Sequence, residues 1–385
     1  MARRKIPAVF VRGGTSKGVF FHASDLPADP AERDAIILHV LGSPDPYQRQ
    51  LNGLGGGISS LSKAVIVAPS RRPDADVDYT FAQVAVDRPI VDFSGTCGNL
   101  SSSVGPFAVD EGLIAVEDGE ACIRVYSTNS DKIYHARFPV KGGQAVEDGD
   151  FAIPGVAGTG SKITLDYIDP GGALTGKLLP SGAVRNTIAV DGLGDIEVSL
   201  IDATNAVIFV DAAAMGYGAT EHPDALDADP LFMARMEEIR RKGAVIMGMA
   251  NRADDAPLAA PKIGIVGPPQ PFEALDGTAY RPEDQSLTVR MISMERVHRA
   301  VPGTNVMGIA AAARIDGTIP HEHARADTPL RVANPSGVIP VEADVIRKPD
   351  GDWHVNAITV YRTQRRLMEG SVPVPERAIR IRNVA

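Results

Sequence analysis

The side chains best suited to chemistry lie in three glycine-rich stretches of the N-terminal part of the sequence. One of them, GTCGNLSSSVGPFA at residues 95–108, places Cys97 between two glycines, directly before an apolar run that predicts a buried helix. The first amides of a helix have no partner within the helix and carry a partial positive charge, so they favour anions and lower the pKa of a nearby thiol. This stretch therefore predicts a reactive thiol beside an anion-binding helix start.

The other two stretches surround a lysine with glycine and hydroxyl groups. RGGTSKG at 12–18 is a glycine-rich turn that lacks the spacing of a nucleotide-binding P-loop. NGLGGGISSLSKAVIV at 52–67 places three consecutive glycines before a strand, so it predicts a backbone that approaches a ligand closely, with Lys63 at the strand's edge. A solvated lysine at the start of a strand explains Lys63 equally well.

Other reactive motifs are weak or missing. His321 and His323 flank one glutamate in a proline-bounded stretch, where we expect a solvent-facing loop rather than a zinc site. Cys122, within EACIRVYS, is expected to be a small buried apolar group in a strand. The sequence has neither the Gly-x-Ser-x-Gly elbow of a hydrolase nor a dinucleotide fingerprint. What remains is acid–base chemistry without a metal or cofactor.

The elements that must position these groups are mostly strands. Short β-branched runs, separated by Gly, Pro and Asp, predict many short strands and few helices. Two helices are marked by Asp-Pro starts, at 31–41 after Asp29 and at 231–243 after Asp229. Two more, rich in small residues, are predicted within 99–112 and 305–317.

The two small-residue helices predict an internal duplication. TSKGVFFHASDL near the start and ATNAVIFVDAAA at 203–214 share a second pattern, although chance similarity is the alternative explanation. Because 385 residues are too many for one compact core, we expect two domains, at 1–185 and 186–385. Each would bury one helix inside a curved sheet, and PGTN at 302–305 would supply a second anion-binding helix start. Two such starts suit a substrate with several carboxylates.

Composition narrows the class of partner. Lys and Arg number 39 and Asp and Glu number 48, so the net charge is −9, spread without long blocks. This charge argues against nucleic acid or an anionic membrane and favours a small molecule. The N-terminal apolar patch is too short for a signal peptide or a membrane span, so we expect a cytoplasmic protein.

The motifs VRGGTSKGVFF, LNGLGGGISSLSK, GTCGNLSSSVGPFAVDEGLI and HRAVPGTN, taken in order, resemble the PrpF family from end to end. That family includes 2-methylaconitate, methylitaconate and oxalomesaconate isomerases. The resemblance implies a diaminopimelate epimerase-like α/β fold, with two pseudo-symmetric domains, each a sheet wrapped around a central helix, and an active site between them. It also implies that the C-terminal strand can return to the first domain.

The activity that this resemblance implies is a 1,3-allylic proton shift on an unsaturated di- or tricarboxylate, without cofactor or metal. Lys63 and Cys97 match the family's acid–base pair by position. A homodimer is a further expectation at the level of the family. The candidate substrate-binding residues are Thr15, Ser16, Lys17, Gly57, Ser62, Gly98, Asn99, Gly303, Thr304 and Asn305.

Bringing a lysine pKa from about 10.4 to about 7 takes roughly 4.6 kcal/mol, whereas a thiol moving from about 8.5 to about 7 takes about 2 kcal/mol. The helix amides that help a thiolate also disfavour an ammonium ion. We therefore expect Lys63 to be the principal proton carrier and Cys97 its partner, although which acts first stays open.

Two alternative functions remain at this stage. One is a non-catalytic accessory protein that keeps the scaffold and binds a carboxylate metabolite. The other is a cofactor-independent amino-acid epimerase. The epimerase is disfavoured because diaminopimelate epimerase relatives carry a second cysteine on the other domain's helix, where this chain has Met307. The sequence leaves open which polycarboxylate is the substrate.

Overall fold

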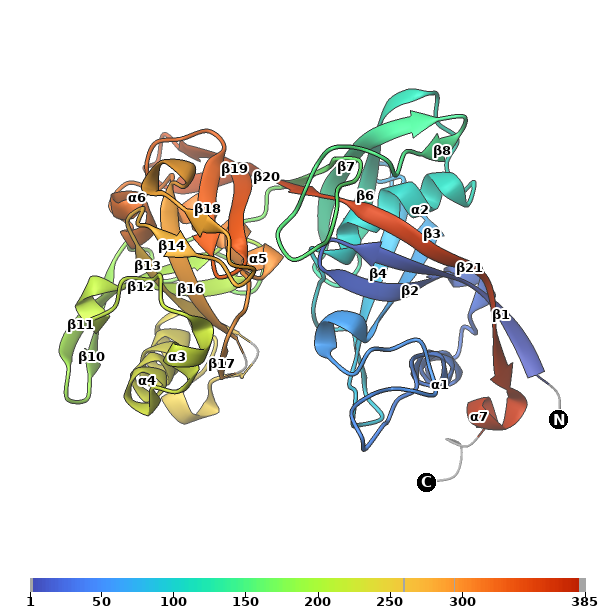
Figure 1. The fold of residues 1–385 in the computed structure, drawn as a ribbon, viewed down its shortest axis with the longest axis horizontal. Helices are drawn as coiled ribbons and strands as arrows, with labels where there is room; N and C mark the ends of the chain where they lie inside the picture. The colour runs from blue at the N-terminus through green and yellow to red at the C-terminus, as the bar shows by residue number, and fades with distance from the viewer. Residues whose placement is uncertain (1–2, 259, 294, 381–385) are drawn as a thin grey trace. The chain divides into compact units, whose positions relative to one another are not determined.

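The computed structural model describes residues 3–258, 260–293 and 295–380. The chain forms two compact units: unit 1 comprises Met1–Asp166 and Tyr361–Ala385, and unit 2 comprises Tyr167–Val360 (Figure 1). The sequence placed the boundary later, after residue 185. The segment from 169 to 185 belongs to unit 2 because its backbone bonds there, with the Gly172 amide donating to the Asp202 carbonyl at 2.8 Å.

Unit 1 is built on a curved mixed sheet. Its strands are β1 (Arg3–Gly13), β2 (Ser16–His22), β3 (Lys63–Pro69), β4 (Val77–Val84), β5 (Val91–Asp92), β6 (Gly119–Ser127), β7 (Lys132–Lys141), β8 (Gln144–Ala145), β21 (Gln364–Pro375) and β9 (Ile163–Ile168), whose last two residues belong to unit 2. From β21 the order runs through β1, β2, β3, β4 and β6 to β7. In Figure 1 the red C-terminal strand β21 lies along the blue strand β1.

Two helices cover the two faces of this sheet. Helix α1 (Pro30–Leu41) begins where the Asp29 carboxylate accepts the Glu32 amide at 2.9 Å, and it packs against Ala64 and Ile66 of β3. On the other face, the 3₁₀ turn η3 (Leu100–Ser103) leads into helix α2 (Val104–Asp110). The Phe107 ring of α2 lies 5.4 Å from that of Phe20. The sheet therefore curves around α2, as expected. Shorter helices are η1 (Ala23–Asp25), η2 (Ser59–Leu61) and α7 (Glu376–Arg380).

Unit 2 repeats this plan. Its strands are β10 (Asn186–Val190), β11 (Gly194–Asp202), β12 (Ala206–Asp211), β13 (Lys262–Gly267), β14 (Phe272–Glu273), β15 (Ala279–Tyr280), β16 (Leu287–Ser293), β17 (Arg296–Val297), β18 (Leu330–Asn334), β19 (Gly337–Arg347) and β20 (Trp353–Arg362), whose last two residues belong to unit 1. Its helices are α3 (Pro223–Asp227), α4 (Pro230–Ile246), α5 (Gly303–Ala312) and α6 (Ile319–His323), with the 3₁₀ turns η4 (Ala213–Met215), η5 (Ala253–Asp255) and η6 (Pro282–Asp284). α4 covers one face of the sheet and α5 the other.

The pairing order demonstrates the duplication. In unit 1, β1–β2 is antiparallel, β2–β3 parallel, β3–β4 antiparallel, β4–β6 parallel and β6–β7 antiparallel. In unit 2 the same alternation runs through β11, β12, β13, β16, β18 and β19. In this comparison α1 corresponds to α4 and α2 to α5, because each pair follows the same strands. The pseudo-symmetric, diaminopimelate epimerase-like α/β architecture is confirmed.

Helix α4 runs three residues past the end predicted at Gly243. A Cβ at this position would overlap Cδ1 of Ile208 in β12. The glycine therefore lets the helix lie close to the sheet, and it does not mark the end of the helix.

Cys122 is exposed, so the prediction of a buried thiol was wrong. It does lie in a strand, β6, but Ala121 and Ile123 take the inward positions of the alternation. Cys122 consequently points to the outer side.

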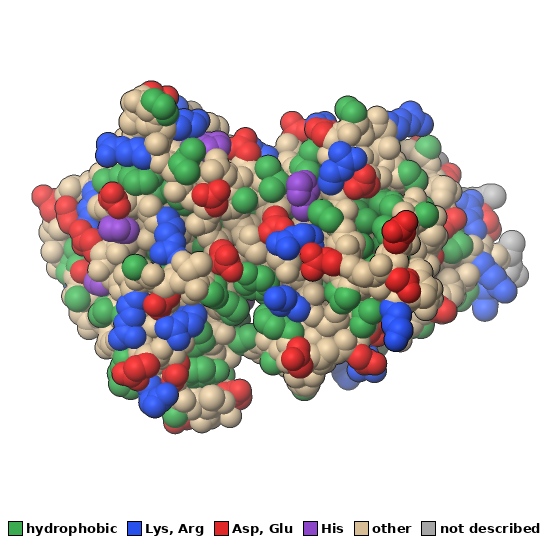
Figure 2. All heavy atoms as spheres, turned by 90° about the horizontal axis from the view of Figure 1, so that it is seen from above, with side chains coloured by type: hydrophobic (Ala, Val, Ile, Leu, Met, Phe, Trp, Pro, Cys, Tyr) green, Lys and Arg blue, Asp and Glu red, His purple; other side chains and the backbone are tan. Residues whose placement is uncertain are grey.

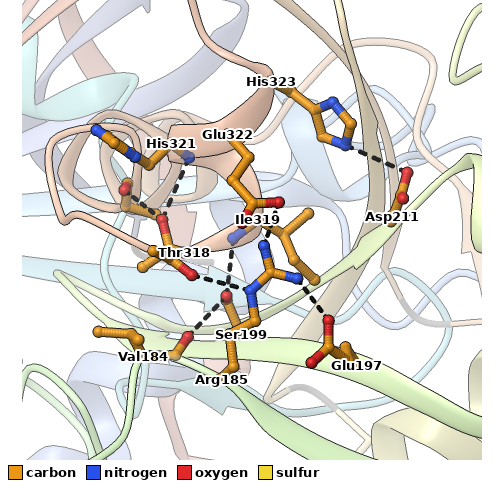
Figure 3. A network of polar contacts seen from close by, with 12 residues as sticks. Val184, Arg185, Glu197, Ser199, Asp211, Thr318, Ile319, His321, Glu322 and His323 are labelled. Carbon is orange, nitrogen blue, oxygen red and sulfur yellow. Dashed lines mark hydrogen bonds and ion pairs between the residues drawn. The ribbon is translucent and has the colours of Figure 1, made fainter.

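The two histidines of 321–323 lie on the short helix α6 rather than in a loop, which corrects our expectation for this stretch. Figure 3 shows that His323 and Glu322 point toward different partners. The three side chains pair separately: His321 with Asp316, His323 with Asp211 and Glu322 with Arg185. Over the described ranges, no group of three or more His, Cys, Asp or Glu side chains gathers as a metal site would require.

On the face drawn in Figure 2, acidic and basic side chains are interspersed across the described surface. No described helix is long and apolar enough to cross a membrane.

Candidate functional site

Lys63 is the first residue of β3, and its side chain lies on the α2 face of the unit 1 sheet. Ala64 and Ile66 pack on the opposite face, in the cluster with α1, so strand alternation directs Lys63 toward α2. The side chain is 8% exposed. Its Nζ donates to Gln83 Oε1 at 2.6 Å and lies 4.9 Å from the centre of the Phe81 ring. Lys63 is thus a buried, oriented amine, and the solvated alternative is wrong.

Gln83 contacts the Lys63 amine, and the sequence analysis did not single it out. Its Nε2 donates to the carbonyls of Ser59 at 3.0 Å and Ser62 at 2.9 Å. With both amide protons engaged there, the Oε1 atom must face Lys63. The available signal was a polar residue at an inward position of β4, two residues after the inward-facing Phe81.

Cys97 lies immediately before the first turn of the central helix, as expected. Its side chain is 6% exposed, and Sγ accepts the Leu100 amide at 3.5 Å. Its carbonyl accepts both the amide and the hydroxyl of Ser101, at 3.0 and 2.8 Å. A backbone N–H therefore points at the sulfur, an arrangement that stabilises negative charge there.

Lys63 and Cys97 are connected through the same face of β4. Tyr79 and Phe81 occupy successive inward positions on this strand. The Tyr79 hydroxyl donates to the Cys97 carbonyl at 3.4 Å, and the Phe81 ring contacts the Lys63 amine. A Cβ at Gly18 would lie 2.8 Å from Leu100 Cδ1 and 3.0 Å from the Lys63 carbonyl. The glycine-rich stretches thus converge around the start of the helix.

Asn99 connects the helix start to the turn between β1 and β2. Its Nδ2 donates to Thr15 Oγ1 at 3.0 Å and to Ser16 Oγ at 3.3 Å, and its Oδ1 accepts from Arg362 Nε at 3.3 Å. Its side chain makes no capping bond to the helix. Gly98 lies between Asn99 and the thiol. Arg362 arrives with the returning C-terminal segment, and nothing in its local sequence indicated this role.

Lys17 does not join this group. It follows Ser16 on β2 and therefore points to the opposite face of the sheet, where its amine lies 5.6 Å from the Phe10 ring. Phe10 packs at the edge of the α1 cluster. The structure thus separates Lys17 from the Asn99 group.

Gly57 and Ser62 are held by Gln50 inside their own loop. The Gly57 amide donates to Gln50 Oε1 at 2.9 Å, and Gln50 Nε2 donates to Ser62 Oγ at 2.7 Å. A Cβ at Gly55 would overlap the Gln50 side chain. The glycine run therefore makes room for its own loop, whereas the sequence predicted close approach to a ligand. These residues support the segment that leads into Lys63.

In unit 2, Gly303, Thr304 and Asn305 form the first turn of α5. Pro302 precedes them, and no side chain caps the helix. Asn305 is fully buried, and its Nδ2 has no hydrogen-bond partner among the described residues. Met307 is buried one turn into the helix. The expected second helix start is therefore present, with uncapped first amides.

Comparison with known proteins places the chain in one family. The family model described as PrpF protein matches residues 3–375. The chain is 39% identical to 2-methyl-aconitate isomerase of Cupriavidus necator, over 96% of this chain and 97% of that protein. A crystal structure of methylitaconate-delta-isomerase is 39% identical, with a TM-score of 0.88 and 98% of each chain covered.

A more distant structure supports the fold alone. The hydroxyproline epimerase from Agrobacterium vitis is 14% identical, with a TM-score of 0.51, and the match covers 98% of this chain and 95% of that one. The isomerases among the relatives of this chain thus define an isomerase, built on the duplicated epimerase-like fold. The chain belongs to the PrpF family.

The contact between Gln83 and Lys63 generates a first prediction. Gln83→Met removes the acceptor that orients the buried Lys63 amine, and a hydrogen bond of this kind contributes about 0.5–1.5 kcal/mol. We expect kcat/KM of the isomerisation to fall by up to about tenfold, measured by steady-state kinetics. Thr80→Val, on the opposite face of β4, is the control and should retain wild-type turnover. Equal rates for Gln83→Met and the wild type would exclude a role for this contact.

Proposed function

We propose that this protein catalyses a cofactor-independent 1,3-allylic proton shift on an unsaturated di- or tricarboxylate such as 2-methylaconitate. The observation that carries the proposal is the placement of Lys63 and Cys97 on one face of the unit 1 sheet, beside the start of the central helix. The two similar isomerases are named for different acids, and their names support this reaction class. The substrate is therefore best sought with a panel of acids.

In the proposed reaction, Lys63 in its neutral form removes a proton from the carbon next to the C=C–carboxylate unit. The electron pair of that C–H bond delocalises into a dienolate, and the Cys97 S–H protonates the far carbon. The double bond moves, and proton transfer from the Lys63 ammonium ion to the thiolate restores the starting state. Every proton is carried by these two side chains or by water, so no electron acceptor is needed.

In this proposal, hydrogen-bond donors bind the carboxylates of the anionic substrate. In unit 1 these are the hydroxyls of Thr15 and Ser16, oriented by Asn99, together with the backbone at Gly98. In unit 2 the uncapped amides of Gly303 and Thr304 are suited to a carboxylate. Preorganised donors of this kind stabilise the charge of a dienolate. A cytoplasmic location and a homodimer stay predictions.

Proton exchange measures the proposed reaction directly. The protein is incubated in deuterated water with cis- and trans-2-methylaconitate, methylitaconate, oxalomesaconate and aconitate, and the vinyl and methylene protons are followed by NMR. We expect at least one acid to exchange and isomerise. Exchange with none would indicate an accessory protein, and exchange at the Cα of an amino acid instead would indicate an epimerase.

Two variants assign the proton carriers. Lys63→Ala should abolish turnover, and Cys97→Ser should lower it about 100-fold or more, the scale of a general acid–base contribution. Lys5→Ala and Cys122→Ser change exposed residues and should retain wild-type rates, measured by the same NMR assay. Substantial turnover by Lys63→Ala would reverse the assignment in favour of Cys97.

A further inference from the structure

Gln50 is a buried residue in segment 43–62, which leads from α1 to Lys63 in unit 1. It is 1% exposed, although its neighbours Arg49 and Leu51 are both exposed. Its φ of 52° lies in the left-handed region, which a residue other than glycine rarely adopts. Such a backbone conformation persists only where the surrounding contacts hold it. The contacts of the Gln50 side chain are therefore the feature that fixes this segment.

The polar atoms of the Gln50 side chain bond to three separate parts of the segment. Nε2 donates to Ser43 Oγ at 2.8 Å and to Ser62 Oγ at 2.7 Å. Oε1 accepts the Gly57 amide at 2.9 Å. These partners lie at the beginning, near the middle and at the end of the segment. Gln50 thus ties the whole segment to the residue directly before Lys63.

Ser62 transmits this constraint to Lys63 through Gln83. The Ser62 carbonyl accepts Gln83 Nε2 at 2.9 Å and the Val84 amide at 3.0 Å. Gln83 Oε1 accepts Lys63 Nζ at 2.6 Å. Hydrogen bonds of 2.7, 2.9 and 2.6 Å therefore connect Gln50, in sequence, to the Lys63 amine.

The groups along this connection are shielded from water. Ser62 is fully buried, and Lys63 is 8% exposed. A Cβ at Gly55 would lie 2.2 Å from Gln50 Oε1, so the glycine run makes room for the Gln50 side chain. Because water does not reach the buried groups to replace a lost partner, each member of the connection holds the next in one orientation.

We propose that Gln50 is a positioning residue for the Lys63 amine and acts on it through Ser62 and Gln83. This inference rests on the proposed function, in which Lys63 removes a proton from the substrate. Proton removal requires the amine to be aligned with the C–H bond, within hydrogen-bonding reach. An amine that rotates freely therefore slows the chemical step and leaves substrate binding nearly unchanged.

Kinetics of Gln50→Met test this role, since methionine keeps the length of the side chain and removes its hydrogen bonds. We expect kcat to fall about fivefold, the scale of one hydrogen bond, with KM within about twofold of the wild type. The substrate is the acid identified by the exchange panel. Gln48→Met is the matched control and should keep wild-type constants, because Gln48 has a similar φ of 56° but is exposed. Wild-type kcat in Gln50→Met overturns the inference.

A double-mutant cycle separates positioning from a general loss of structure. Gln83→Met already frees the Lys63 amine, so adding Gln50→Met should lower kcat less than about twofold further. Reductions that multiply would show that Gln50 acts independently of Gln83, and would overturn the inference. Ser62→Ala breaks the same connection and should lower kcat about threefold. That variant decides the matter should Gln50→Met not fold, because wild-type kcat in Ser62→Ala also overturns the inference.

Labelling of Lys63 with acetic anhydride, read by peptide mass spectrometry, gives a readout that needs no turnover. Lys63 should be acetylated about threefold faster or more in Gln50→Met than in the wild type, because Gln83 no longer holds the amine. Lys348, an exposed lysine of unit 2, is the internal reference. Equal labelling of Lys63 in both proteins overturns the inference and leaves the proposed function intact. Faster labelling in a protein that turns over none of the acids would instead refute the proposed function.

Discussion

The hydrogen bond from Lys63 to Gln83 fixes the position of the amine that we propose as proton carrier in unit 1. It fixes a buried amine on the α2 face of the sheet, over the Phe81 ring, at the point where the helix start presents an amide to Cys97. Had the strand been shifted by one residue, the amine would face α1 on the other side of the sheet. The register of β3 is therefore the constraint on which the proposed acid–base pair depends.

The duplicated fold places different side chains around equivalent positions in its two units. Both units place a lysine at the first residue of an equivalent strand and a helix start beside it. Unit 1 adds a thiol and an amide acceptor, whereas unit 2 has Met307 within its helix, and Lys262 has no hydrogen-bond acceptor among the residues that the structure describes. The units thus share a fold and differ in the side chains around the equivalent lysines, and we propose proton transfer for the lysine of unit 1.

Short sequence motifs were enough to predict much of the fold and part of the candidate site. The Asp-Pro starts predicted α1 and α4 because a carboxylate before a proline caps a helix, and both aspartates accept amides as expected. Cys97 was identifiable from its glycines and the apolar run that follows. Composition did not show that Lys17, Gly57 and Ser62 lie apart from Asn99, because strand face and loop packing decide their positions. The contact of Gln83 with Lys63 depends on the register of β3 and β4. The contact of Arg362 with Asn99 depends on the return of a segment that is distant in the sequence.

A direct test of the central claim, that the Lys63 amine and the Cys97 thiol share one site, is reaction with o-phthalaldehyde. This dialdehyde forms a fluorescent isoindole only where one amine and one thiol reach the same reagent molecule. The account predicts an isoindole that peptide mapping assigns to residues 63 and 97, and that Lys63→Met and Cys97→Ser both lack. Separate modification of the amine and the thiol in the wild-type protein, without any isoindole joining them, would contradict the account.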